Sequence, residues 1–304
     1  MSDITLVDDH LKSGAGLVVS FQRTLRVPED DRSHPLPPTR GRFPVRAVAD
    51  FAHRLPTEWR GPHHFFLPMY QREALWLALD APSWRPCVVK IGLGGFDAVS
   101  GEPWEPRLAA GDQDYLVCPP QLWVDGVNAR SGEVRQFVAT PLGRRGTIES
   151  QLRGVDKVGG IQLAVFEPRP GKFPDEPPDG GDDESELPQS GGELGVGAGG
   201  LIRQKIYADP HGLETWRESP SAEVFVHLLN SAEYRDVTGV DPPATPVEVQ
   251  SYLDAGLPWF TMYHDDFDAV PPASAFDEVA GIGSGCDPEE QGSRPERGVQ
   301  DPDS

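Results

Sequence analysis

The stretch LVVSFQRTLRV, residues 17–27, alternates apolar and polar side chains in the manner of a half-buried β-strand. Side chains along a strand point alternately to its two faces, so a period of two places one face against a core. The proline-rich loop that follows ends the strand, because proline has no backbone donor. The apolar positions of this alternation are Val19, Phe21, Leu25 and Val27.

Similar short runs recur along the whole chain and are separated by Pro and Gly. The 32 Pro and 33 Gly are nearly twice their usual combined share of roughly 12%, which argues against long helices. The sequence therefore predicts a mainly β fold, sandwich-like or two packed antiparallel sheets, with a few short helices. The further predicted strands are 65–77 (with a short helix as the alternative), 87–93, 115–118, 122–124, 134–139, 159–166, 201–207 and 223–229.

Short helices are predicted at three places. Residues 46–55 place apolar side chains at i, i+3, i+4 and i+7. Ser231 is a capping residue for a helix that ends at Gly239. Thr245 followed by proline predicts the start of a third helix, which Gly256 ends.

Composition divides the chain into one body and two acidic additions. Residues 168–200 and 276–304 each carry eight acidic against two basic residues, a net charge of −6 apiece. The first is rich in Pro and Gly and nearly lacks aromatic residues, so it cannot bury enough surface to offset the entropy of ordering. We expect disorder in both additions, a frayed N-terminus at 1–15, and one β-rich body formed by 16–167 and 201–270.

Charge and cysteine content restrict the class of partner. The body keeps −9 of the total charge of −21, which repels nucleic-acid phosphates and anionic lipids, so we expect neither nucleic acid nor membrane as a partner. Three cysteines without CxxC spacing argue against a disulfide framework and a zinc site. With no signal-peptide pattern and no apolar segment of ~18 residues, we expect a cytoplasmic protein without a cofactor.

Catalytic and metal-binding motifs are absent from the sequence. The glycines at 92–95 follow a strand but open no helix and precede no Lys-Ser/Thr pair, so they predict a turn or bulge. The acidic run at 265–268 lacks the Gly and Glu of an EF-hand loop and predicts a solvated turn. His63 and His64 are adjacent and would point to opposite faces of a strand, so we expect separate surface or loop histidines and no metal site.

Polar and aromatic side chains within the strand-rich regions form the remaining candidate site. Such side chains usually lie on a solvated face, but they also form grooves in which Arg and aromatic faces hold a ligand or a partner segment. The candidate binding residues are Tyr70, Gln71, Arg72, Asp97, Trp104, Trp123, Asp125, Asn128, Arg135, Gln136, Arg203 and Gln204.

One pattern occurs twice in the chain. Val134-Arg135-Gln136 leads to a Pro-x-Gly turn at 141–143, and Ile202-Arg203-Gln204 leads to another at 210–212. A pseudo-repeat of two related sheets explains the echo, and so does the shared preference of strands and turns for these residue types.

Several phrases resemble those of a family of conserved bacterial proteins of unassigned function. The resemblance covers about residues 17–265, excludes the acidic insert and tail, and implies one continuous body without adding catalytic residues. The phrases are FLPMYQREALWLAL (66–79), AVSGEPWEP (98–106), VRQFVATPLG (134–143), GGIQL (159–163), IRQKIYADPHG (202–212) and GLPWF (256–260).

Two classes of function stay open at this point. The lack of a catalytic frame favours a binding or interaction module that takes an unknown protein or small-molecule ligand. The alternative is a carboxylate-dependent hydrolase or carbohydrate-acting enzyme that uses Asp97, Glu102 and Asp125. Such an enzyme needs two carboxyl groups roughly 5–10 Å apart across a cleft.

Overall fold

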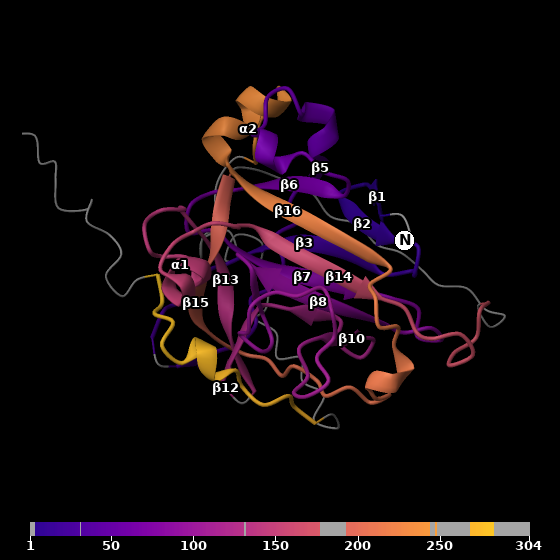
Figure 1. Ribbon diagram of the computed structural model, residues 1–304. Helices are drawn as coiled ribbons and strands as arrows, with labels where there is room; N and C mark the ends of the chain where they lie inside the picture. The colour runs from indigo at the N-terminus through magenta and orange to yellow at the C-terminus, as the bar shows by residue number, and fades with distance from the viewer. Residues whose placement is uncertain are drawn as a thin grey trace, which may run out of the picture.

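A computed structural model describes residues 4–30, 32–130, 132–176, 193–243, 247 and 268–282. Over these residues the protein is mainly β, with two mixed, mostly antiparallel sheets of nine and seven strands, two short helices and no closed barrel (Figure 1). The predicted fold class is therefore confirmed. Within the described part of the chain, no helix is long and apolar enough to cross a membrane.

The first sheet contains the strand predicted at residues 17–27. That strand, β3, pairs with β7 along its whole length, and β7 pairs in turn with β13. The strands of this sheet are β1 (Ile4–Val7), β2 (His10–Ser13), β3 (Val18–Thr24), β4 (Ser33–His34), β7 (Ala74–Asp80), β11 (Trp123–Val124), β12 (Gly126–Arg130), β13 (Glu133–Thr140) and β15 (Glu193–Arg203).

The second sheet is centred on β16 and β14, which are antiparallel neighbours. On its other side β16 pairs in parallel with β6, which follows β16 in register from Phe225 opposite His64 to Asn230 opposite Met69. The strands are β5 (Arg46–Ala47), β6 (His64–Met69), β8 (Cys87–Leu93), β9 (Phe96–Asp97), β10 (Leu116–Cys118), β14 (Ile161–Phe166) and β16 (Ala222–Asn230).

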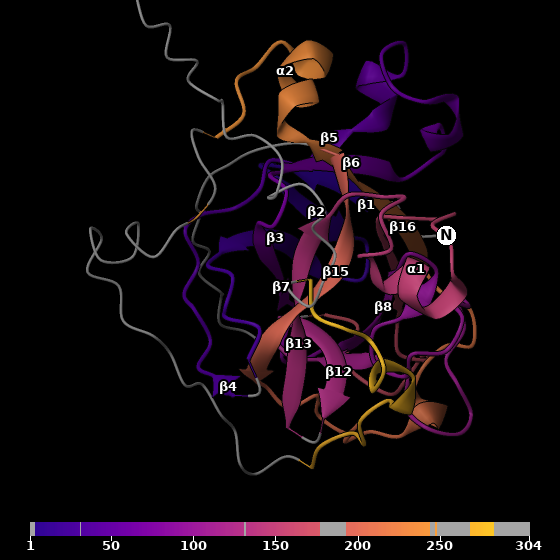
Figure 2. The same cartoon turned by 90° about the vertical axis from the view of Figure 1, so that its left-hand side faces the viewer.

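Strand β15 joins the two sheets. Its first residues pair with β16 and the rest pairs with β13, so it passes from one sheet to the other (Figure 2). Glycines permit this close passage: a Cβ at Gly200 would lie 2.0 Å from the carbonyl oxygen of Pro28. The start of β15 at Glu193 falls within the stretch 168–200 that was predicted to be disordered. Pairing first with β16 and then with β13 stabilises this segment of weak β propensity.

The main core lies between the sheets and is formed by the inward-facing residues of both. Phe21 and Phe137 from the first sheet are fully buried there, as are Ile91 and Val226 from the second. Along β3 the alternation is less complete than the sequence predicts, because Ser20 and Gln22 are buried as well. The loop around 37–43 covers their face, with Thr39 donating a hydrogen bond to the Gln22 amide oxygen.

The two helices flank the sheets. Helix α1 (Ile148–Arg153) begins after Thr147, whose hydroxyl accepts from the Ser150 N–H, and ends at Gly154 in the left-handed region. Helix α2 (Ser231–Thr238) matches the predicted helix, but its N-cap is Asn230 rather than Ser231. It packs at the end of the molecule where segment 46–62 also lies (Figures 1 and 2).

Single turns of 3-10 helix complete the described structure. The predicted helix at 46–55 is wrong: residues 46–47 form β5 against β6, which leaves room for one 3-10 turn only. The third predicted helix, at 245–256, lies outside the described residues except for residue 247. The 3-10 turns are η1 (Val48–Phe51), η2 (Thr57–Trp59), η3 (Leu213–Thr215) and η4 (Ser274–Phe276).

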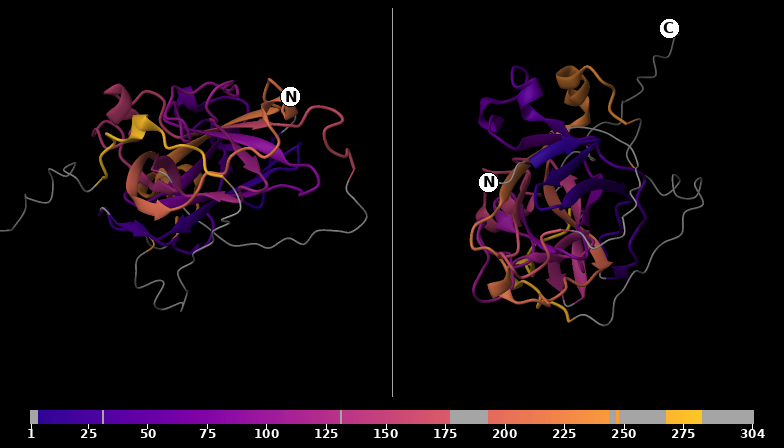
Figure 3. Two further views of the ribbon diagram at one scale, coloured as in Figure 1. Left: turned by 90° about the horizontal axis from the view of Figure 1, so that it is seen from below. Right: turned by 90° about the vertical axis from the view of Figure 1, so that its right-hand side faces the viewer.

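Both ends of the described chain contain more structure than the composition predicts. Residues 4–13, expected to fray, form the β1–β2 hairpin with Leu11 buried. Residues 268–282 lie beside β12 and α1 (Figure 2), with Phe276 and Ile282 buried, although the tail was expected to begin at 276. Figure 3 shows the same segment, in yellow, from two further sides. In both segments a few apolar side chains are buried and stabilise the structure. The average composition of each end of the chain does not indicate this.

Candidate functional site

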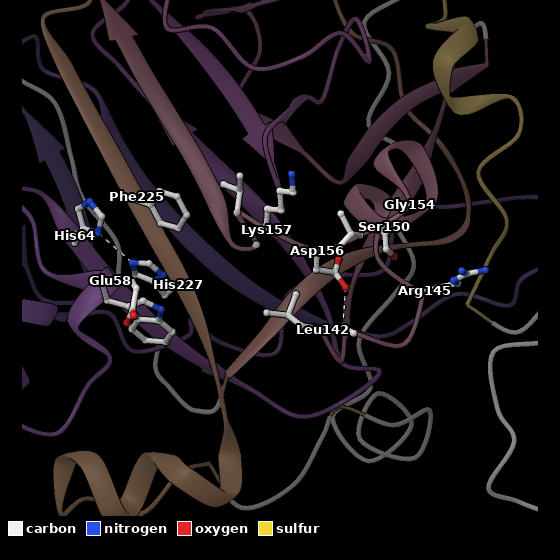
Figure 4. A pocket seen from close by; sticks show the side chains of 15 residues that line it. Glu58, His64, Leu142, Arg145, Ser150, Gly154, Asp156, Lys157, Phe225 and His227 are labelled. Atoms are coloured by element: carbon white, nitrogen blue, oxygen red, sulfur yellow. Dashed lines mark hydrogen bonds between the residues drawn. The ribbon is translucent and has the colours of Figure 1, made fainter.

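A cavity of about 750 Å³ opens beside the outer face of β16. One side is formed by β6, β16 and η2, and the other by the two loops that flank α1 (Figure 4). Each side presents a different kind of side chain, and we call these sides the ring wall (Trp59, His64, Phe225 and His227) and the aliphatic wall (Leu142, Val155 and Val158).

The ring wall follows from strand alternation and parallel pairing. On β16, Val224, Val226 and Leu228 face the main core, so Phe225 and His227 point to the opposite face. The parallel register places His64 of β6 beside Phe225. Residues far apart in sequence thereby share one surface.

The four rings of the ring wall form a stack. Trp59 lies flat on His227, with ring centroids 4.0 Å apart and an interplanar angle of 9°. Phe225 stacks on His227 at 4.4 Å and on His64 at 5.3 Å. His227 is buried, while the other three rings are half-buried and can contact a ligand.

The two histidines are hydrogen-bonded to one another, with His64 Nδ1 and His227 Nε2 3.1 Å apart. Burial, with a smaller contribution from His64, lowers the pKa of His227 to about 3. Burial also lowers the pKa of His64, against a backbone hydrogen bond with Trp59 that favours the charged form. Both rings are therefore uncharged at neutral pH. The expectation for adjacent His63 and His64 did not consider His227, which the pairing of β6 with β16 brings to His64.

The aliphatic wall exposes an unusual amount of apolar surface. Leu142, Val155 and Val158 are 52%, 48% and 41% exposed. Three of the six exposed large hydrophobic side chains in the described part of the chain thus gather on this one cavity. Exposed apolar patches of this kind mark binding surfaces more often than isolated exposed side chains do.

Two carboxylates hold the loops of the aliphatic wall in place. Buried Glu149 accepts hydrogen bonds from the backbone N–H groups of Lys157, Val158 and Gly159, at 2.8–3.1 Å. Asp156 accepts from Gly143 N–H at 2.6 Å and from the Thr147 hydroxyl. The wall is therefore fixed before any ligand arrives, which lowers the entropic cost of binding.

The charges around the cavity are mixed. Glu58 is exposed and lies on the side of the cavity that the ring wall forms. Lys157 is also exposed and lies on the side of the aliphatic wall (Figure 4). Arg145 adds a second cation, and the Asp156 carboxylate is already engaged in the loop. The cavity therefore has no strong field of either sign, and its apolar walls dominate recognition.

Among the sequence-predicted site residues, Trp104 lies closest to this region. It lines a cavity of about 320 Å³ together with His64 and Phe225. Its indole packs against Gly92, where a Cβ would approach it to 2.5 Å. The glycines after β8 form the predicted turn, with Gly94 and Gly95 at positive φ.

Tyr70, Gln71 and Arg72 form the turn between β6 and β7. Arg72 adopts φ +68°, and its N–H donates to Ala139 at 2.8 Å. The Tyr70 hydroxyl donates to the carbonyl of Pro243, and the Gln71 side chain is exposed. These three residues are on different elements from the ring wall.

The paired Arg-Gln segments are direct neighbours in the first sheet. Val134 lies opposite Ile202, so the two echoing segments are antiparallel partners. Arg135 is half-buried and Arg203 exposed, whereas both glutamines are buried. One buried glutamine thus lies within β13, at Gln136, and the other directly after β15, at Gln204.

The buried glutamine side chains bond to backbone N–H and C=O groups that have no neighbouring strand to pair with. Gln136 accepts from Val27 N–H at 2.9 Å and donates to the Leu25 carbonyl at 2.9 Å. Gln204 accepts from Asp125 N–H and donates to the Trp123 carbonyl. An amide presents one acceptor and donors side by side, so it satisfies both groups of an extended backbone.

Asp97 belongs to a buried ionic cluster. Its Oδ1 accepts from the Val99 and Ser100 N–H groups at 2.9 Å, and its Oδ2 lies 3.7 Å from Lys90 Nζ. Burial raises the pKa of Asp97 to about 7, although Lys90 partly opposes the rise. Lys90 also donates to Asp114 and to the Arg107 carbonyl.

Asp125 is fully buried beside buried Trp123, and neither carboxylate oxygen has a hydrogen-bond partner among the described residues. Burial raises the pKa of Asp125 well above its ordinary value. Asn128 is buried too, and its amide donates to the carbonyls of Val99 and Pro271. Glu102 is exposed, so the three carboxyl groups considered for an enzyme differ in their access to solvent.

Sequence reasoning missed all four residues of the ring wall. One signal was present: in EVFVHLL, residues 223–229, the aromatic residue and the histidine share one face of the predicted strand. The parallel pairing of β6 with β16, which completes the wall, has no local sequence signature. Among the described residues, no three His, Cys, Asp or Glu side chains gather as a metal-ligand set.

Comparisons with protein-family models, with curated proteins and with solved structures found no match to this chain. The resemblance to a bacterial family stays a prediction. The case for function therefore depends on the geometry of the site.

Proposed function

We propose that this protein is a binding module that holds a ring-bearing ligand between the ring wall and the aliphatic wall. One observation carries the proposal: three half-buried rings and three exposed aliphatic side chains face a single cavity of about 750 Å³. Ligand sites are typically concave and mostly apolar, with a few polar groups that fix orientation. The uncharged imidazole pair, Glu58 and Lys157 supply such groups here.

Stacking explains why a ring is favoured over a flexible chain. Aromatic faces carry partial negative charge and prefer offset-stacked or edge-on partners with positively polarised hydrogens. A rigid ring also loses little conformational freedom on binding. We expect Phe225 to be the main contact, because it stacks on both histidines and its ring is half-buried.

Ligand-observed saturation-transfer NMR with small ring compounds and open-chain analogues of equal size tests the proposal. We expect saturation of the ring compounds only, and Phe225→Ala to weaken their binding about tenfold. Phe173→Ala is the matched control, since Phe173 is also half-buried and stacks on a ring, that of Trp216, elsewhere in the molecule. Equal losses in both variants, or equal binding of the open-chain analogues, contradict the proposal.

The carboxylate-dependent enzyme is the second candidate, and the state of Asp97 favours it. A carboxyl group with a pKa of about 7 beside Lys90 is suited to proton transfer. Ser100 and Glu102 line an adjacent cavity of about 680 Å³. Because the Asp97 side chain is enclosed and bonded within its own turn, we rank this function below ring binding. Hydrolysis of a sugar or ester substrate that Asp97→Asn abolishes, with folding intact, would reverse the order.

A further inference from the structure

Three cavities follow one another along the outer face of β16. The cavity of about 320 Å³ is lined by Glu223 and Phe225, the central cavity by Phe225 and His227, and a third, of about 190 Å³, by His227 and Asn230. Neighbouring cavities share lining residues, and their order follows the strand. Seven residue steps of a strand span about 23 Å at roughly 3.3 Å per residue, far more than one ring requires.

Main-chain recognition is not available to an occupant of this row. β16 is hydrogen-bonded to β14 on one side and to β6 on the other, so its backbone cannot accept an added peptide strand. The occupant must be recognised by side chains alone. These side chains include the rings of Trp104, Phe225 and Trp59. Trp104 lies over Gly92 of β8, two strands across the sheet from Phe225, because Gly92 pairs with Gln162 and Gln162 with Phe225. The row therefore begins beside β16 and then follows it.

The polar side chains of the row favour hydroxyl groups over charged groups. Exposed Glu223 and Glu58 accept hydrogen bonds, exposed Asn230 both donates and accepts, and the histidine pair is uncharged. The cations Lys157 and Arg145 are balanced by these acids, so no single sign selects a polyanion. A pyranose ring matches this arrangement, because C–H bonds cover its faces and hydroxyl groups surround its edge.

We infer that the row is one groove that binds an extended, neutral oligosaccharide, with successive sugar rings on Trp104, Phe225 and Trp59. The inference builds on the proposed ring binding and adds the class and the length of the ligand. Phe225 and Trp59 hold the central sugar units. Trp104 holds a unit at the end of the groove, beyond the reach of a short ligand.

Isothermal titration with cello-, malto- and chito-oligosaccharides of one to six units tests the inference. For one series we expect the dissociation constant to fall at least tenfold with length and then to level off once the groove is filled. Trp104→Ala is expected to weaken binding of the hexasaccharide about tenfold and of the disaccharide less than twofold. Trp84→Ala is the matched control, since Trp84 is half-buried and lies outside the lining of the three cavities.

Glu223→Ala provides a second variant at the same end of the groove, because this side chain is exposed and lies outside the core. It is expected to weaken binding of the hexasaccharide as well. If single-ring compounds bind in a Phe225-dependent manner but no series gains affinity with length, the extended oligosaccharide is excluded while ring binding stands. Binding of an apolar peptide in place of every sugar excludes it too. If no ring compound binds, both proposals fail.

Discussion

At the scale of single residues, the ring wall makes stability depend on pH. His227 titrates near 6.5 in the unfolded chain and near 3 in the fold, so between these values the unfolded chain binds more protons. Acidification from pH 6.5 to 4 therefore destabilises the fold through this residue, by roughly 3 kcal/mol.

His227→Phe keeps a ring in the stack and removes the titrating group. Urea unfolding at pH 7 and pH 4 is expected to show a smaller acid-induced loss of stability in this variant than in the wild type. Groups with raised pKa values, such as Asp97 and Glu73, make the fold more stable on acidification. They are present in both proteins, so their contributions cancel in the comparison. Identical pH dependence of the two proteins would falsify the assignment of an uncharged, buried His227.

Asp125 predicts the opposite dependence on pH. Its pKa is raised in the fold, so the folded chain binds this proton more tightly than the unfolded chain does. The fold is therefore more stable at acid pH and loses stability as pH rises towards the folded pKa. Asp125→Asn is expected to gain stability over the wild type by about 1–3 kcal/mol at pH 8, and by less at pH 5. Thermal unfolding at both pH values measures this difference. Asp112→Asn, at an exposed position, serves as the control, and a gain independent of pH would contradict the account.

At the scale of elements, the buried glutamines complete the sheets where strands are missing. Gln136→Leu leaves the Val27 N–H and the Leu25 carbonyl, both bonded to this amide, without a partner. We expect a loss of about 2–5 kcal/mol in the free energy of unfolding. Gln71→Leu, at an exposed turn position, is expected to change it by less than about 0.5 kcal/mol. Denaturant unfolding compares the two, and similar small effects would show that the Gln136 amide is not structural.

Elements differ in how far the sequence predicts them. The strand at 17–27 follows from its alternation alone. The position of α2 follows from Ser231 at its start and Gly239 at its end, although its N-cap is Asn230. The run 65–77 proved to be two strands, β6 and β7, because the turn at Tyr70 to Glu73 interrupts it. The start of β15 could not be predicted, since its glycines are required by close neighbours, such as the Thr140 side chain at Gly197, rather than favoured by β propensity.

At the scale of the whole molecule, the candidate site arises from long-range pairing. His64 and His227 are 163 residues apart in sequence, and the aliphatic wall comes from loops that two carboxylates fix around α1. Composition and motifs predict neither the histidine pair nor the aliphatic wall, because each depends on which strands and loops become neighbours in the fold. Of the predicted site residues, Trp104 lies in the groove, while Gln136 and Gln204 are buried and bonded to backbone.

The most direct test of the central claim is the indole N–H region of ¹⁵N-labelled protein during titration with a ring ligand found in the saturation-transfer experiment. Ligand binding between the two walls predicts a shift of the Trp59 resonance, assigned by a Trp59→Phe variant, while the resonances of buried Trp123 and Trp216 stay in place. A bound ligand that shifts Trp216 and leaves Trp59 unchanged would contradict the claim that the β16 face is the binding site.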